Sequence, residues 1–168
     1  MLNKVVKAQE KQLGSEHTST LSTKYALATV YHSQRRYTNA ETLLTQVLES
    51  REKLLGPEHL DTLTTTHELA RVYHSQKRYG DGEVLFKRVL QSVQKLLGSD
   101  HPNTLTTQYH LGLLYHSQGR SDEAEALVGH VLSRREQVLG VSHPSTQAAR
   151  DALASIRSVQ ERCAEAMN

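Results

Sequence analysis

One dipeptide recurs along the chain at a constant interval. Leu-Gly occurs at residues 13–14, 55–56, 97–98 and 139–140, so successive copies begin 42 residues apart. The same interval relates the three copies of Tyr-His-Ser-Gln, at residues 31–34, 73–76 and 115–118. Chance does not place so many identities in one register. The chain is therefore a tandem array of one repeat, in which each repeat buries its apolar face against its neighbours.

Each repeat is predicted to form two helices. The first is expected at residues 18–34, where apolar side chains follow three- and four-residue steps, and the second at residues 38–55. Glycines at 56, 98 and 140 suit the end of the second helix, and residues 80–82 are predicted to form a turn between helices. The apolar positions of the first helix are Leu21, Leu27, Ala28, Val30 and Tyr31. Those on one side of the second helix are Ala40, Leu43, Leu44, Val47, Leu48, Arg51, Leu54 and Leu55.

These patterns predict an all-α solenoid of antiparallel helix pairs. The predicted organisation is a half repeat with only a second helix (1–14), three complete repeats (15–56, 57–98 and 99–140), and a half repeat or capping helix (141–168). At the start, Val5, Val6 and Leu13 align with Val47, Leu48 and Leu55. The array is therefore expected to be a piece of a longer one.

Composition excludes several classes of function. Hydrophobic residues are 37% and charged residues 23% of the 168 residues, and the net charge of +2 is too balanced to favour nucleic acid or a membrane surface as a partner. No apolar run is long enough to span a bilayer, and the start of the chain lacks the apolar segment of a secretion signal. A single cysteine, Cys163, excludes an intramolecular disulfide framework. We therefore expect a cytoplasmic protein.

Small and large residues alternate within each repeat in a recognisable pattern. The first helix carries Leu27-Ala28-Tyr31, and its later copies are Leu69-Ala70-Tyr73 and Leu111-Gly112-Tyr115. The second helix carries a small and then a bulky residue, at Ala40 and Leu44, at Ala124 and Val128, and less regularly at Gly82 and Phe86. This pattern resembles the tetratricopeptide repeat over essentially the whole chain. The resemblance implies a right-handed superhelical solenoid.

The repeat length narrows the resemblance. Tetratricopeptide repeats usually have about 34 residues, whereas the 42-residue form with L-G-x-x-H-x-x-T between repeats resembles those of kinesin light chains and nephrocystins. Near-identical tandem copies are most similar to the C-terminal arrays of fungal NACHT or NB-ARC NTPases of the NLR-like (STAND) class. The resemblance implies that the chain is the ligand-sensing array of such an innate-immunity receptor, whose NTPase lies in a separate region.

A polar stripe of the first helix remains after packing. In tetratricopeptide arrays this stripe lines the concave wall, so the resemblance implies a groove that binds a protein or peptide. The stripe varies between repeats while the packing positions do not, which favours a ligand, although any exposed position can drift. The paired asparagines with which kinesin light chains hold cargo have no counterpart here. The predicted groove residues are Ser22, Tyr25, Thr29, His32, Thr64, His67, Arg71, His74, Thr106, Tyr109, Leu113, His116 and Asp151.

The ten histidines mostly follow the repeat. Four lie between repeats and are predicted to satisfy backbone groups at helix ends, and His32, His74 and His116 are expected as a solvated ladder on the groove rim, or else as groups whose protonation near pH 6 makes the groove cationic. None forms a helical zinc-binding pair, and no catalytic constellation is evident. We therefore predict no metal, no cofactor and no enzymatic activity. The basic pairs at 35–36, 77–78 and 134–135 are expected to offset helix dipoles.

Two alternatives remain open. The chain could be a cargo adaptor like a kinesin light chain. It could also assemble head to tail, because the second helix at its start and the free first helix at its end (145–162) are complementary halves of one repeat, and such a contact does not close on itself. The residues predicted to form these assembly ends are Leu2, Val5, Val6, Leu13, Leu153 and Ile156.

Overall fold

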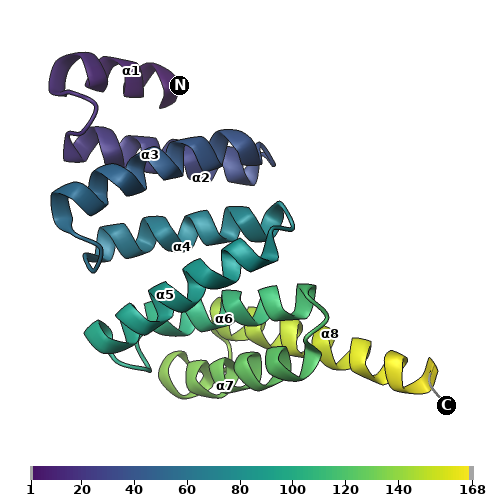
Figure 1. The fold of residues 1–168 in the computed structure, drawn as a ribbon. Helices are drawn as coiled ribbons and strands as arrows, with labels where there is room; N and C mark the ends of the chain where they lie inside the picture. Colours follow the sequence, from purple (N-terminus) through teal and green to yellow (C-terminus); the bar gives the residue numbers. More distant parts are fainter. Residues whose placement is uncertain (1, 167–168) are drawn as a thin grey trace. The chain divides into compact units, whose positions relative to one another are not determined.

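The computed structural model describes residues 2–166, apart from the side chains of residues 163, 164 and 166, so the side chain of Cys163 lies outside the described residues. Within this range the chain forms eight α-helices and no strand (Figure 1). The prediction of an all-α solenoid of antiparallel helix pairs is confirmed. The helices are α1 (Leu2–Leu13), α2 (Thr18–Ser33), α3 (Tyr37–Leu55), α4 (Leu60–Ser75), α5 (Tyr79–Leu97), α6 (Pro102–Ser117), α7 (Ser121–Leu139) and α8 (Pro144–Ala166).

The predicted helices of the repeat agree with α2 and α3 to within one residue at each end. The turn predicted at residues 80–82 is wrong, because α5 already begins at Tyr79 and contains both glycines. The helix starts there as it does at the matching positions of α3 and α7. Gly82 is buried, so tertiary packing overrides the poor helix propensity of glycine.

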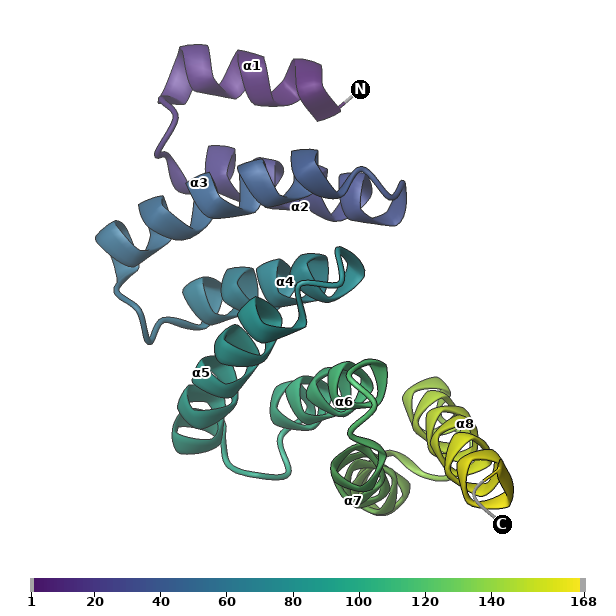
Figure 2. The same ribbon diagram turned by 45° about the vertical axis from the view of Figure 1, so that its right-hand side comes forward.

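The chain divides into two compact units, an N-terminal unit (residues 1–85) and a C-terminal unit (residues 86–168). In the N-terminal unit, α1, α2, α3 and α4 pack in chain order, and Figures 1 and 2 show α2 beside α3. In the C-terminal unit, α6 packs on α7 and α7 packs on α8. The N-terminal core contains Val6, Leu27, Ala28, Tyr31, Ala40, Leu44, Leu69 and Val72, and a smaller C-terminal cluster contains Leu105, Val131 and Ala149.

A repeated backbone turn ends each first helix. After α2, the N–H of Arg35 donates to the carbonyl of His32 (2.9 Å) and that of Arg36 to the carbonyl of Tyr31 (2.8 Å), which is the Schellman pattern. The residue after the cap is left-handed, with φ of 60° at Arg35, and at the matching positions 63° at Lys77 and 79° at Gly119. The following arginine then lies over the tyrosine ring. The pairs are Arg36 over Tyr31 (4.2 Å), Arg78 over Tyr73 (4.1 Å) and Arg120 over Tyr115 (3.9 Å).

The histidines between repeats cap the helices that follow them, as predicted. His59 has extended backbone, and its Nδ1 accepts a hydrogen bond from the N–H of Asp61 at 3.1 Å. This bond satisfies one of the free donors in the first turn of a helix. The other three bonds run from Ser19 to His17 (3.2 Å), from Asn103 to His101 (3.2 Å) and from Ser145 to His143 (3.1 Å).

The two ends of the chain differ in packing. The helix predicted to end at 162 continues to Ala166 in α8, and Leu153 and Ile156 are buried in the C-terminal unit. Val6 is likewise buried against the N-terminal core. The expectation that these three side chains form exposed assembly faces is therefore wrong, because each is already covered within its own unit. Three polar contacts fasten α8 to α7: Arg150 to Glu136 (2.6 Å), Arg157 to Glu125 (2.7 Å) and Gln160 to Asp122 (2.9 Å).

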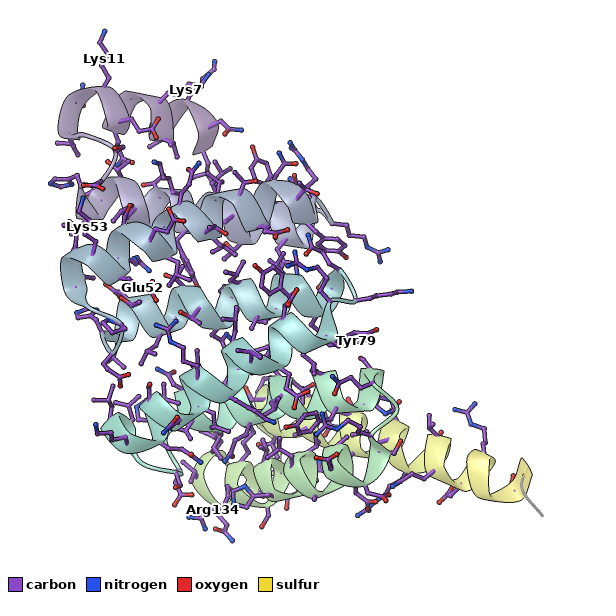
Figure 3. The ribbon with its side chains drawn as sticks, viewed as in Figure 1. Lys7, Lys11, Glu52, Lys53, Tyr79 and Arg134 are labelled. Atoms are coloured by element: carbon purple, nitrogen blue, oxygen red, sulfur yellow. The ribbon has the colours of Figure 1, made fainter. Side chains whose placement is uncertain are left out.

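The N-terminal helix, α1, is less covered by the rest of its unit than α8 is. Val5 is 40% exposed, whereas the matching Val47 is fully buried. Leu13 is exposed and Leu2 is half-buried. Lys7 and Lys11 extend from α1 away from α2 (Figure 3), so the outer face of α1 is polar.

Candidate functional site

Two neighbouring first helices of the N-terminal unit, α2 and α4, carry the predicted groove residues. The two helices are in contact, and six of their side chains are half-buried and so can both pack and meet a ligand. Ser22 and Thr64, at the start of the stripe, are exposed. The half-buried set is Tyr25, Thr29 and His32 from α2 with His67, Arg71 and His74 from α4. We call these eight residues the N-terminal groove face.

An ion pair between two residues of α4 forms part of the N-terminal groove face. Nη1 of Arg71 donates to both carboxylate oxygens of Glu68, at 2.8 and 3.0 Å, and Nδ1 of His67 lies 3.8 Å from one of them. Burial by itself raises the pKa of Glu68. The contact with His67 and the charge and hydrogen bonds of Arg71 outweigh it and lower the pKa to about 2. Glu68 is thus a fixed anion that holds the half-exposed Arg71 guanidinium in place.

Tyr25 lies beside a second arginine, Arg51. This arginine was predicted only as part of the packed side of the second helix. The Arg51 guanidinium lies 5.5 Å from the centre of the Tyr25 ring. Its Nη1 donates to the carbonyl of Asp61 (2.9 Å) and to Oγ1 of Thr65 (2.8 Å). Burial raises the pKa of Tyr25 to about 12, and the nearby Glu68 carboxylate acts in the same direction. The Tyr25 hydroxyl therefore stays protonated and can donate to a ligand.

The rim histidines are not solvated, which corrects the expectation. His32 is half-buried, its Nε2 lies 2.8 Å from Oγ of Ser75, and its ring meets that of Tyr37 edge-on. Since Ser75 donates its hydroxyl to the carbonyl of Arg71 (3.0 Å), Nε2 of His32 is the donor in this pair. Burial, followed by the charge of Arg71, lowers the pKa of His32, and the same two causes lower that of His74. Both rings are therefore protonated less readily than an ordinary histidine.

The C-terminal unit has a simpler groove face, in which α6 and α8 are in contact. The hydroxyl of Tyr109 donates to the carbonyl of Ala148 (3.4 Å), and burial raises the pKa of Tyr109. Nδ1 of His116 is buried, with no hydrogen-bond partner among the residues that the structure describes. Asp151 is exposed and accepts from Gln147 (2.8 Å). The predicted members of this face are Thr106, Tyr109, Leu113 and His116 from α6 and Asp151 from α8.

Arg135 repeats the role of Arg51 in this unit. It is 4% exposed, and its guanidinium lies 4.9 Å from the centre of the Tyr109 ring. Nη1 donates to the carbonyl of Ser145 (2.8 Å) and Nη2 to Oγ1 of Thr106 (3.4 Å). The expectation that this arginine simply offsets the dipole of its own helix is wrong, because its charge is directed at α8 and α6. The signal in the sequence was the 84-residue spacing of Arg51 and Arg135, which matches that of Tyr25 and Tyr109.

The described residues include no group of three His, Cys, Asp or Glu side chains that could hold a metal ion. In the same range, no helix is both long and apolar enough to cross a membrane. What the two faces offer chemically is hydrogen bonding and cation–aromatic contact with a ligand.

These features agree with comparisons to known proteins. A family model described as tetratricopeptide repeat matches residues 19–81 and 61–137. The chain therefore belongs to the tetratricopeptide repeat family, whose members are in general non-catalytic scaffolds for protein–protein interaction. A comparison with curated proteins found no match.

Solved structures are similar over nearly the whole chain. They include crystal structures of nearly identical TPR-like repeats from a Podosopora anserina protein assigned to the kinesin light chains, in a parent and a variant form. These are 33% identical, with TM-scores of 0.77 and 0.78, and the match covers 99% of this chain and 78–79% of theirs. BtubC (BKLC) from P. vanneervenii is similar in fold, at 19% identity and a TM-score of 0.75, over 84% of this chain and 57% of that one.

Proposed function

We propose that the chain is a non-catalytic module that binds a segment of a protein partner along its groove faces. The N-terminal groove face carries the larger part of this interaction. The observation that supports the proposal is the placement of Arg71, which is held by Glu68, remains half-exposed and acts through its charge on Tyr25, His32 and His74. Tyrosine and arginine are enriched among residues that dominate binding energy, and a side chain already fixed by its neighbours loses little entropy when a ligand binds.

The resemblance extends this proposal to a cellular setting. We propose that the module is the ligand-sensing array of a larger cytoplasmic NLR-like NTPase. The near-identical repeats support this assignment. If it holds, nucleotide hydrolysis by the longer protein changes when the bound segment is added. A kinesin-light-chain-like adaptor is the second candidate, favoured by the similarity to kinesin light chain-type repeats. The adaptor predicts instead that the chain binds a kinesin-light-chain cargo peptide.

The groove proposal can be tested without knowing the partner. Peptides selected from a display library against the chain are measured for affinity to the parent and to two variants. Arg71→Ala removes the central cation of the N-terminal groove face, and Lys53→Ala removes an exposed cation in the last turn of α3. We expect Arg71→Ala to weaken binding at least tenfold and Lys53→Ala less than twofold, with equal helix content by circular dichroism. Equal affinities for both variants would refute the site.

A further inference from the structure

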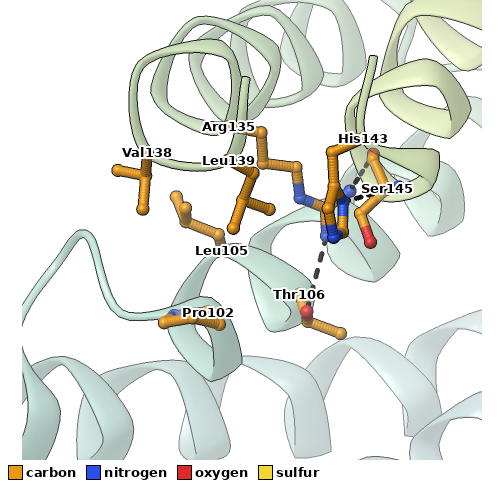
Figure 4. Close-up of a pocket in the computed structure, with 8 residues that line it drawn as sticks. All are labelled: Pro102, Leu105, Thr106, Arg135, Val138, Leu139, His143 and Ser145. Carbon is orange, nitrogen blue, oxygen red and sulfur yellow. Dashed lines mark hydrogen bonds between the residues drawn. The ribbon is translucent and has the colours of Figure 1, made fainter. Parts of the chain in front are cut away.

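A cavity of about 210 Å³ lies in the C-terminal unit, where α7 ends and α6 and α8 begin (Figure 4). Its walls differ in character. One side is apolar, and the other carries the Arg135 guanidinium with the hydroxyl of Thr106 and the first turn of α8, as Figure 4 shows. Such a division suits a ligand with one apolar and one polar end. The apolar side is formed by Pro102, Leu105, Val138 and Leu139.

Arg135 is a buried cation without a counter-ion. It forms no ion pair with a carboxylate in the described part of the chain, and its two hydrogen bonds go to a carbonyl and a hydroxyl. Burial lowers its pKa, and the neighbouring Tyr109 acts in the opposite direction. A buried charge is normally paired or otherwise neutralised. The guanidinium still has unused N–H donors, and it lines the cavity.

The N-terminal unit has an arginine, Arg51, in the same position. Arg51 makes the matching bond to the backbone of α4, but there the residue is Asp61, whereas the C-terminal unit has Ser145. Arg51 also acts on the same tyrosine as the Glu68 carboxylate. Arg135 likewise acts on Tyr109 together with the Asp151 carboxylate. The two arginines are therefore equivalent in position, and each donates to a carbonyl and a hydroxyl. A ligand carboxylate in the cavity would give Arg135 a direct ionic partner.

We propose that this cavity binds a small apolar acid, with its carboxylate on Arg135 and Thr106 and its body against Leu105, Val138 and Leu139. The volume corresponds to several water molecules, at roughly 30 Å³ each. It is below the roughly 300 Å³ at which pockets for drug-sized ligands begin. One aromatic ring or one short branched chain therefore fills it. Arginine and carboxylate form short, charge-assisted hydrogen bonds. This site is separate in composition from the groove faces, sharing only Thr106 with them.

The test is a titration of the full chain with 3-phenylpropionate, followed through the backbone amide signals of Thr106, Val138 and Ser145. We expect saturable shifts at these amides. The uncharged 3-phenylpropionamide has the same body and should bind at least tenfold more weakly. Equal binding of acid and amide would overturn the role of Arg135. A tripeptide ending in phenylalanine with a free carboxylate distinguishes the source: tighter binding than the free acid supports a chain terminus, and weaker binding supports a small molecule.

A variant at the exposed rim of the cavity separates binding from folding. Val138 is about half-exposed, so Val138→Phe fills the apolar side without changing the core. It should abolish the shifts while leaving helix content unchanged. The matched control is Leu54→Phe, because Leu54 occupies the equivalent position of the N-terminal unit and is similarly exposed. Leu54→Phe should leave the titration unchanged. Retention of binding by Val138→Phe would contradict the proposed site.

Discussion

Two arginines at equivalent positions of the two units show how near-identical repeats acquire different chemistry. Arg51 and Arg135 are both buried, both lie beside a tyrosine of the groove face, and both donate to the first turn of the following helix. Arg51 donates to the carbonyl of Asp61 and to the hydroxyl of Thr65. Arg135 donates to the carbonyl of Ser145 and to the hydroxyl of Thr106, and it lines a cavity. Packing geometry is thus shared by the repeats, whereas the hydrogen-bond partners of each arginine depend on single residues beside it.

The largest expected effect concerns Glu68, the fixed anion of the N-terminal unit. Its pKa of about 2 in the folded chain lies below the ordinary 4.5, so the unfolded chain binds the proton more readily. The stabilisation is therefore present above pH 4.5 and is lost as the pH falls towards 2. The full loss is about 3 kcal/mol in the free energy of unfolding, of which about 2 kcal/mol falls above pH 3. Urea denaturation at pH 6, 4 and 3 measures it.

The control is Glu68→Gln, which should flatten that pH dependence. The matching residues of the first and third repeats are Ala26 and His110, so hydrogen exchange in acid should rise first in α2 and α4. Faster exchange in α6 to α8 would break the comparison between the units.

The next largest effect on stability is expected from replacing Arg51 or Arg135. Arg51→Met removes hydrogen bonds at 2.9 and 2.8 Å to the carbonyl of Asp61 and the hydroxyl of Thr65, and should cost about 2 kcal/mol. Arg135→Met removes a buried cation that has no counter-ion, and a well-packed apolar replacement should cost less than about 1 kcal/mol. Chemical denaturation of both variants measures the difference. Equal costs would mean that the surroundings of the two arginines do not matter.

A glycine in the C-terminal unit gives a smaller effect. Where the N-terminal unit has Ala28 and Ala70, α6 has Gly112, and a Cβ there would lie 2.6 Å from Cγ2 of Val128. Gly112→Ala should therefore destabilise by about 1–2 kcal/mol despite the better helix propensity of alanine. Gly129→Ala, whose Cβ would meet nothing within 4 Å, should stabilise by about 0.5–1 kcal/mol. Thermal unfolding of the two variants tests this. Higher stability in both would show that the Val128 side chain moves to make room for the added methyl group.

The smallest expected effect is a gain in stability from a substitution in the N-terminal unit. Arg35 and Lys77 hold left-handed backbone that the C-terminal unit assigns to Gly119. Arg35→Gly should stabilise by a few tenths of a kcal/mol to about 1 kcal/mol, because relief of strain outweighs the added entropy of the unfolded chain. Gly119→Ala is the converse and should destabilise. A stability loss in Arg35→Gly would show that its side chain, rather than its backbone, sustains the turn.

The repeat period predicted the fold well, because a 42-residue register fixes which helices face one another. It also predicted the histidine caps, since His17 and its three copies stand where a first helix begins. The role of Arg135 was predicted wrongly, because the helix dipole alone is enough to explain a charged residue near a helix end. Its burial depends on Tyr109 and Ser145, which lie on other helices.

The dependence of burial on residues from other helices also explains the other wrong predictions. His32 was expected to be solvated because its spacing places it on the rim, but its burial follows from Ser75 and Tyr37 on neighbouring elements. Leu153 and Ile156 were expected to be exposed because they were assigned to an unpaired first helix, yet both are buried within the C-terminal unit. Helix periodicity gives the face of a residue, whereas partners from other helices decide what that face meets.

The most direct test of the account is to map a selected peptide onto the chain by amide chemical shifts. The account predicts that the largest shifts fall on the N-terminal groove face, at Thr29, His32, Arg71 and His74, and that they disappear in Arg71→Ala. Shifts concentrated on the outer surface of α1 or the end of α3, at Lys7, Lys11 and Lys53, would contradict it.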